Sequence, residues 1–172
     1  MALYALAHIV PQIDPDAFVH PDCTIIGNVV IGPGSTIWPQ AVLRGDQSRI
    51  VIGARTSVQD GAVLHCTRSL ETVVGKDCTI GHLAHLEGCT VEDGALVGTG
   101  SIVLHRAIVR SGALVGAGAL VPSDMEVPGG AMALGVPAKL REGTVRSDQI
   151  THPANEYARN WERYRKELRR ID

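Results

Sequence analysis

The sequence predicts an all-β fold, a parallel β-helix of hexapeptide repeats followed by a C-terminal α-helix, and three observations support this prediction. Aliphatic residues recur at every sixth position, a period that fits neither an ordinary strand nor an α-helix. Glycine commonly follows a repeated position by one to three residues. Hydrophobic residues make up 45% of the 172-residue chain but aromatic residues only 3%, so the core must be aliphatic, as suits a narrow coil. The repeated positions are Val19, Ile25, Ile31, Ile37, Leu43, Ile52, Val58, Leu64, Val74, Ile80, Leu86, Val91, Val97, Val103, Val109, Val115 and Val121.

We expect residues 1–150 to form the β-helix and residues 151–172 to form the α-helix. Residues 1–18 are interpreted as a lead-in that caps the first coil. Coils then run from about 19 to 126 with three hexapeptides each, so residues one coil apart stack on each other. Residues 127–150 are rich in Pro and Gly and are expected to leave the coil as irregular chain.

Three departures from the six-residue period are visible. Gly45–Val51 and residues 67–73 add residues to their coils, whereas the step from Leu86 to Val91 is one residue short. Added residues can bulge outward without breaking the stack, and such loops commonly carry function.

The C-terminal segment carries one apolar stripe at helical spacing, which predicts a helix that packs along the coil or on a neighbouring subunit. Tyr157 is the stripe residue that we retain as a candidate functional residue. The stripe consists of Tyr157, Trp161, Tyr164, Leu168 and Ile171.

The composition excludes several classes of partner. A formal net charge of −2 gives no reason to expect a nucleic acid or an anionic membrane surface. Neither a signal peptide nor a membrane span is visible, so we expect a cytoplasmic protein. Cys23, Cys78 and Cys89 each stand two positions before an inward aliphatic residue, where a small core residue is needed. Cys66 follows His65, and the pattern assigns it no role. The lack of a C-x-x-C motif argues against a zinc knuckle or a redox pair.

Polar residues beside the inward columns predict two ridges on the outside of the coil. The first polar ridge consists of Arg44, His65 and Glu87, and the second polar ridge of Gln59, Asp60 and His82. Adjacent strands lie about 4.8 Å apart, so side chains on adjacent coils can share a metal ion at bonds of about 2.0–2.2 Å. A narrow β-helix has no interior room for a site. If three copies pack around an axis, one ridge of each subunit can face the other ridge of its neighbour.

Each of these residues also has a plainer interpretation. An isolated outward histidine is most often a solvated side chain, and this class holds His8, His20, His105 and His152. Arg44 with Asp46 could form an ordinary surface ion pair, worth under about 1 kcal/mol. Gln59 with Asp60 could cap a turn. The joint placement of histidines, an arginine, a glutamine and acids on neighbouring coils favours a site.

At these residues the chain resembles the γ-class carbonic anhydrases, from about residue 10 to 165. The matching segments are AVLRGD at 41–46, SVQDGAVLH at 57–65, IGH at 80–82 and GCTV at 88–91. The resemblance implies a left-handed β-helix, an exception to the usual crossover handedness. It also implies a homotrimer with three metal sites between subunits.

The resemblance implies a role for each matching residue. Arg44 and Asp46 match the inter-subunit pair that orders the family's site. Gln59 and Asp60 match its water-orienting pair, and Ser57 stands where an asparagine is frequent. Our candidate catalytic residues are therefore Arg44, Asp46, Gln59, Asp60 and Tyr157.

His65 and His82 match two of the family's three metal ligands, and the implied metal is zinc, with iron or cobalt possible. In the family, the first and third ligands come from one subunit and the second from its neighbour. The family pattern G-H-x-x-x-x-H-G-C places the third histidine at residue 87, where this chain has Glu87, with an extra histidine at His85. Residues 85 and 87 both point outward, about 6–7 Å apart. Glu87 could complete the site, His85 could swing in, or metal binding could be weak or absent.

The implied activity is reversible hydration of CO2 to bicarbonate by a zinc lyase. Zinc lowers the pKa of its bound water to about 7 in carbonic anhydrase, which supplies hydroxide to attack CO2. Glu87 as a ligand would add negative charge and make that water less acidic. We therefore expect weaker CO2 hydration, or an optimum at higher pH.

The sequence also allows two functions other than CO2 hydration. ALGVPAK at 133–139 looks like the turn that ends the coils of hexapeptide acyltransferases, which use acetyl-CoA. The replaced third histidine favours instead a non-catalytic trimer that binds a metal or a siderophore-type small molecule. Metal analysis and acetyl-CoA binding distinguish the three hypotheses.

Overall fold

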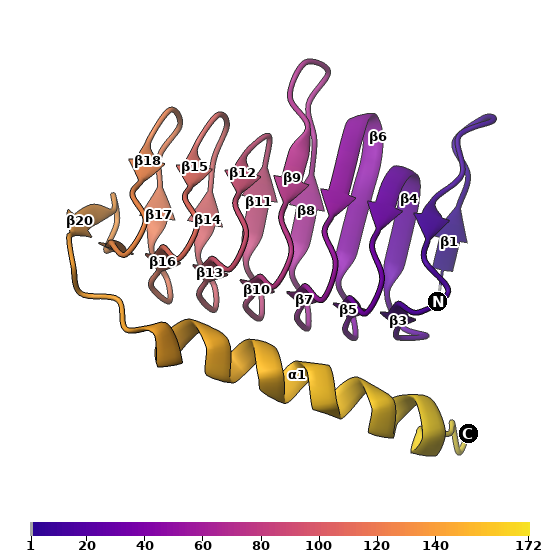
Figure 1. Cartoon of the computed structure of the whole chain (residues 1–172). Coiled ribbons are helices and arrows are strands. Elements are labelled where there is room, and N and C mark those ends of the chain that lie inside the picture. Colours follow the sequence, from indigo (N-terminus) through magenta and orange to yellow (C-terminus); the bar gives the residue numbers. More distant parts are fainter. Residues whose placement is uncertain (1) are drawn as a thin grey trace.

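The structure, a computed structural model, describes residues 2–172, with the exception of the side chains of Ser147 and of residues 151–159. The chain winds into a parallel β-helix with three faces, and a single long helix, α1 (Ser147–Glu167), runs back along it (Figure 1). Both ends of the chain therefore lie at the same end of the coil (Figure 1). The predicted all-β, left-handed hexapeptide coil with a C-terminal helix is confirmed.

Short strands repeat on each of the three faces. The first face holds β1 (Ala2–Tyr4), β8 (Val63–His65), β11 (His85–Glu87), β14 (Ile102–Val103) and β17 (Leu120–Val121). The second face holds β2 (Gln12–Ile13), β9 (Thr72–Val74), β12 (Thr90–Val91), β15 (Ile108–Val109) and β18 (Glu126–Val127). Two longer strands pass from the first face to the second, β4 (Thr24–Ile31) and β6 (Val42–Ile52).

The third face forms a sheet of its own. Its strands are β3 (Phe18–Val19), β5 (Thr36–Ile37), β7 (Ser57–Val58), β10 (Thr79–Ile80), β13 (Leu96–Val97), β16 (Leu114–Val115), β19 (Met132–Leu134) and β20 (Lys139–Arg141). All of these pair in parallel except β19 with β20, which pair antiparallel. The coil therefore continues to Leu134, past the expected end near residue 126, and residues 127–150 are less irregular than their Pro and Gly content predicts.

The inward columns stack as the six-residue period predicts. Leu64 pairs with Leu43 on one side and with Leu86 on the other, and Leu86 pairs with Val103. On the third face Val58 pairs in the same way with residues 37 and 80. These side chains are fully buried, so the core is a stack of aliphatic layers, one per coil.

The extra residues after Leu43 form a bulge. Gly27 pairs with Gly45 but Val29 pairs with Ile50, so residues 46–49 stand opposite a single residue of β4. A bulge of this kind re-aims side chains while the ladder continues on either side. The insertion between β8 and β9 projects further, as the tallest loop of the coil (Figure 1). Both insertions leave the stack intact, as predicted.

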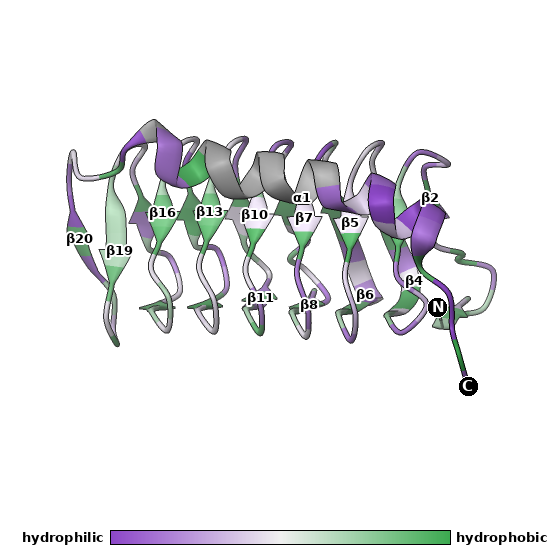
Figure 2. Cartoon of the chain, turned by 90° about the horizontal axis from the view of Figure 1, so that it is seen from below, coloured by the Kyte–Doolittle hydropathy of each residue, from purple (hydrophilic) through white to green (hydrophobic). Residues whose placement is uncertain are grey.

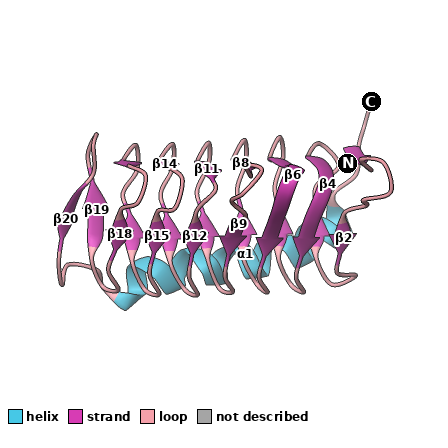
Figure 3. Cartoon of the chain, turned by 90° about the horizontal axis from the view of Figure 1, so that it is seen from above, coloured by secondary structure: helices cyan, strands magenta, loops and turns pink. Residues whose placement is uncertain are grey.

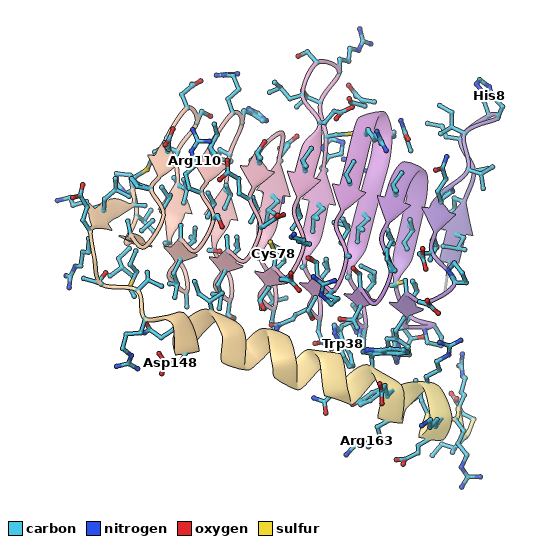
Figure 4. All side chains as sticks on the ribbon, viewed as in Figure 1. His8, Trp38, Cys78, Arg110, Asp148 and Arg163 are labelled. Carbon is cyan, nitrogen blue, oxygen red and sulfur yellow. The ribbon has the colours of Figure 1, made fainter. Side chains whose placement is uncertain are left out.

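Helix α1 packs against the third face, where it contacts β5, β7 and β10 (Figure 2). Seen from the opposite side, it lies behind the coil (Figure 3). Trp38 points towards it (Figure 4), and the Tyr164 ring lies 5.0 Å from the Trp38 ring and 6.3 Å from that of Phe18. This helix packs on its own coil, and Tyr164 is an aromatic residue that anchors it there.

The helix differs from its prediction at both ends. It begins at Ser147 rather than at 151 and ends at Glu167 rather than at 172. Leu168 and Ile171 follow it and are 45% and 88% exposed, so Leu168 is about half covered and Ile171 does not pack on the coil. The Tyr157 side chain lies outside the described residues. Across the part of the chain that the structure describes, no helix is both long and apolar enough to cross a membrane.

All four cysteines are buried, and none forms a disulfide. Cys23, Cys78 and Cys89 occupy the corner position that alanine fills in other coils, which confirms their predicted role in the core. Burial raises the pKa of the Cys89 thiol to about 12 and that of Cys78 and Cys23 to about 11. These thiols are therefore protonated near neutral pH and unreactive.

We expect no cysteine of the native protein to react with Ellman's reagent at pH about 8. Each thiol is shielded from the reagent, and burial raises the pKa of three of the thiols well above the ordinary value. All four should react once guanidinium unfolds the chain. A thiol that reacts quickly in the native protein would contradict the buried positions described above.

Candidate functional site

The first polar ridge lies along the first face, where three coils bring their outward side chains into line. Arg44 pairs with His65, and His65 with Glu87, on adjacent strands β6, β8 and β11. His65 Nδ1 lies 2.9 Å from Glu87 Oε1, and His65 Nε2 lies 3.0 Å from Asp46 Oδ1. Arg44 in turn donates from Nη1 to Asp46 Oδ2. The bulge in β6 brings Asp46 back over His65.

His65 is held between two carboxylates and is largely shielded, with a side chain 15% exposed. Carboxylate oxygens only accept hydrogen bonds, and a neutral imidazole has a single N–H. His65 therefore satisfies both contacts only when a cation, either a second ring proton or a metal ion, sits on one of its nitrogens. The donor set of this ridge, imidazole with carboxylate, is one that zinc accepts.

The surroundings of Asp46 and Glu87 favour the charged form of both carboxylates. Partial burial raises the pKa of Asp46, but hydrogen bonds from Arg44 and His65 outweigh it and leave the pKa below its ordinary value. Partial burial acts on Glu87 in the same way. The hydrogen bond from His65 and the nearby His65 and His105 rings outweigh it, so the pKa of Glu87 is also lowered. Both groups are therefore available as anions at neutral pH.

The second polar ridge lies beside the third face, at the turns after β7 and β10. His82 Nδ1 is 2.9 Å from Asp60 Oδ2, and the His82 backbone N–H donates to Gln59 Oε1 at 3.2 Å. His82 and Asp60 stay 42% and 46% exposed, whereas Gln59 is only 4% exposed. Gln59 is therefore buried, and its amide oxygen accepts a hydrogen bond from the turn that carries His82, which agrees with the plainer interpretation of a turn cap. Its predicted water-orienting role stays a prediction.

Ser57 is also not part of an open site. It is 3% exposed, and its hydroxyl accepts hydrogen bonds from Thr36 Oγ1 and Trp38 Nε1, both at 3.1 Å. Arg44 and Asp46 form their ion pair within one chain in this structure. Their predicted role between subunits stays a prediction.

Glu87 and His85 differ in what they face. Glu87 is in register with His65, whereas His85 is in register with Val63. His85 Nε2 points back to Glu87 Oε2, at 3.6 Å. Glu87 is therefore the better placed of the two candidates for the third ligand position beside His65.

His105 is a residue near the site that sequence reasoning missed. We expected it to be a solvated side chain, but its Nε2 is buried and lies 3.6 Å from Glu87 Oε2. The six-residue period carried no direct signal, because this coil is 17 residues long, with Leu86 paired to Val103, so the residue one coil after Glu87 is Leu104 and His105 comes one position later.

The two ridges occupy different corners of the coil. Among the described residues, no group of three or more His, Cys, Asp or Glu side chains is arranged to hold a metal ion. The first polar ridge offers an imidazole and a carboxylate, and the second polar ridge offers the exposed His82. Within one chain, the described residues of the two ridges therefore do not meet at one site.

Comparisons with known proteins show what the chain is similar to. The family profile "Bacterial transferase hexapeptide (six repeats)" matches residues 11–45. The chain is 42% identical over 136 residues to gamma carbonic anhydrase 2, mitochondrial, of Arabidopsis thaliana, an alignment that covers 76% of this chain and 49% of the relative. It is 41% identical over 104 residues to carnitine operon protein CaiE of Escherichia coli O157:H7, with coverage of 60% and 53%.

A solved structure agrees over nearly the whole chain. A hexapeptide transferase family protein from Anaplasma phagocytophilum superposes with a TM-score of 0.91 at 36% identity, covering 95% of this chain and 98% of that one. The chain spans about half the length of the curated relatives it matches. The chain therefore belongs to the hexapeptide-repeat proteins and is a γ-carbonic-anhydrase-like member of that family.

Proposed function

We propose that the protein is a metal-dependent carbonic anhydrase that interconverts CO2 and bicarbonate at sites shared between the subunits of a homotrimer. His65 and Glu87 of one subunit and His82 of the next would hold the metal. The observation that carries this proposal is the 2.9 Å contact between His65 Nδ1 and Glu87 Oε1, two donors on adjacent coils with charges and geometry that suit a divalent cation. Similarity to the Arabidopsis γ-carbonic anhydrase supports the same assignment.

The remaining residues would act around the metal. Zinc bound there would supply a water that ionises near neutral pH. Asp46, fixed by Arg44, would hold the ring of His65 in position through the contact to Nε2. Asp60 would fix the ring of His82 in the same way, and Gln59 would hold the turn that presents it.

CO2 hydration by zinc- or cobalt-loaded protein, followed from pH about 6.5 to 9, tests this proposal. Activity should rise with pH across this range, because Glu87 adds negative charge at the metal and makes the bound water less acidic. His82→Ala should bring both activity and bound metal down to the level of the apoprotein. A wild-type protein that holds metal but hydrates no CO2 at any pH would exclude the enzyme and leave a metal-binding trimer.

A second candidate is acyl transfer, favoured by the transferase family to which the Anaplasma structure belongs and by the matching family profile. A ridge of the kind formed by Arg44, His65 and Glu87 is not expected of an acyltransferase. Saturable binding of acetyl-CoA by metal-free protein would favour this candidate, and its absence would remove it.

A further inference from the structure

The two carboxylate oxygens of Glu87 have different surroundings. Oε1 faces His65 Nδ1 at 2.9 Å, on the side where the metal is proposed to bind. Oε2 faces away from His65, towards His85 Nε2 and His105 Nε2, each at 3.6 Å. Three coils thus contribute to the position of this one carboxylate.

His105 is built to point at Glu87. Its side chain is 38% exposed, yet Nε2 itself is shielded from solvent and makes no hydrogen bond within the described part of the chain. A buried ring nitrogen without a hydrogen-bond partner lowers the stability of the fold. Glu87 Oε2 is the carboxylate oxygen that faces His105 Nε2. The distance of 3.6 Å exceeds a hydrogen bond, and a small rotation of either side chain would close it.

The His105 ring packs against Gly88. A Cβ atom added at Gly88 would lie 3.2 Å from His105 Cδ2 and 3.0 Å from Leu70 Cβ. The ring therefore packs over the bare backbone of Gly88, in a space that a side chain would fill. This packing limits the positions of the ring on the side of Gly88, next to Glu87.

We propose that His105, with His85 beside it, is a positioning residue that holds Oε2 of Glu87 and leaves Oε1 as the single oxygen offered to the metal. This inference rests on the proposed metal site. A carboxylate in place of a histidine can rotate or bind through both oxygens, and hydrogen bonds from surrounding side chains are the usual means of fixing such a ligand. The role of His105 is to donate from Nε2 and keep Glu87 in one orientation.

Two substitutions separate this role from simple packing. His105→Gln keeps an N–H donor close to the position of Nε2, whereas His105→Leu fills similar space without a donor. Zinc affinity is measured by competition with a chromophoric chelator, and the visible spectrum of the Co²⁺-loaded protein reports the ligand geometry. His105→Leu should weaken zinc binding by about 10–100-fold and alter the Co²⁺ spectrum. His105→Gln should stay near the wild-type value in both.

Matched controls and stability complete the experiment. His8→Leu and His8→Gln, at an exposed site near the N-terminal end (Figure 4), should change neither readout. The thermal midpoint of each metal-free variant shows whether a loss of affinity follows from a loss of fold. A His105→Leu variant with wild-type affinity and spectrum would overturn the inference, and so would equal losses in the Leu and Gln variants. Wild-type protein that binds no metal would overturn the proposed site itself, and metal binding without CO2 hydration would refute only the proposed activity.

Discussion

Replacement of Leu86 by alanine is expected to lower the free energy of unfolding by about 3–5 kcal/mol, the upper part of the range for buried leucines. Leu86 is fully buried, and it stacks between Leu64 of the previous coil and Val103 of the next. The backbone ladder fixes the spacing of the coils, so these neighbours cannot close the cavity. The flanking residues, His85 and Glu87, would lose their support at the same time.

Guanidinium unfolding at matched protein concentration measures this effect, because a stability that depends on assembly also depends on concentration. Leu140→Ala makes the same chemical change at a leucine that is 38% exposed, and it should cost less than about 1 kcal/mol. Equal losses in the two variants would mean that the aliphatic stack does not dominate the stability of the coil.

The core could be predicted from the sequence because the six-residue period fixes the register. Once Leu64 is inward, Leu43 and Leu86 must lie in the same column, and the structure pairs them in that way. The same argument predicts from the sequence alone that His65 lies opposite Glu87, and the structure pairs the two residues. A period of six thus predicts the columns and which outward residues become neighbours on adjacent coils.

Surroundings that depend on other segments could not be predicted in this way. Gln59 follows an inward residue and is therefore expected to point outward, yet it is 4% exposed and accepts a hydrogen bond from the backbone of His82 on the next coil. His105 sits in a turn like several exposed residues. Its approach to Glu87 depends on the space over Gly88, which periodicity does not reveal.

A mixture of two inactive variants provides the sharpest expected result for the shared site. His65→Ala damages the first polar ridge and His82→Ala the second, so each protein alone should bind no metal and hydrate no CO2. In trimers formed from equal amounts of both, some sites combine an intact first ridge with an intact second ridge from the neighbour. Random assembly gives such sites about one quarter of the time, so metal content and activity should recover to about a quarter of the wild-type values.

A matched mixture distinguishes this recovery from general effects of mixing. His65→Ala and Glu87→Ala both damage the first polar ridge, so no mixed trimer of these two contains an intact first ridge, and recovery should be absent. Native mass spectrometry of differently tagged subunits shows whether mixed trimers have formed. Mixed trimers of His65→Ala and His82→Ala that regain neither metal nor activity would rule out a site shared between the two ridges, since in that arrangement every mixed trimer contains one interface that joins an intact first ridge to an intact second ridge.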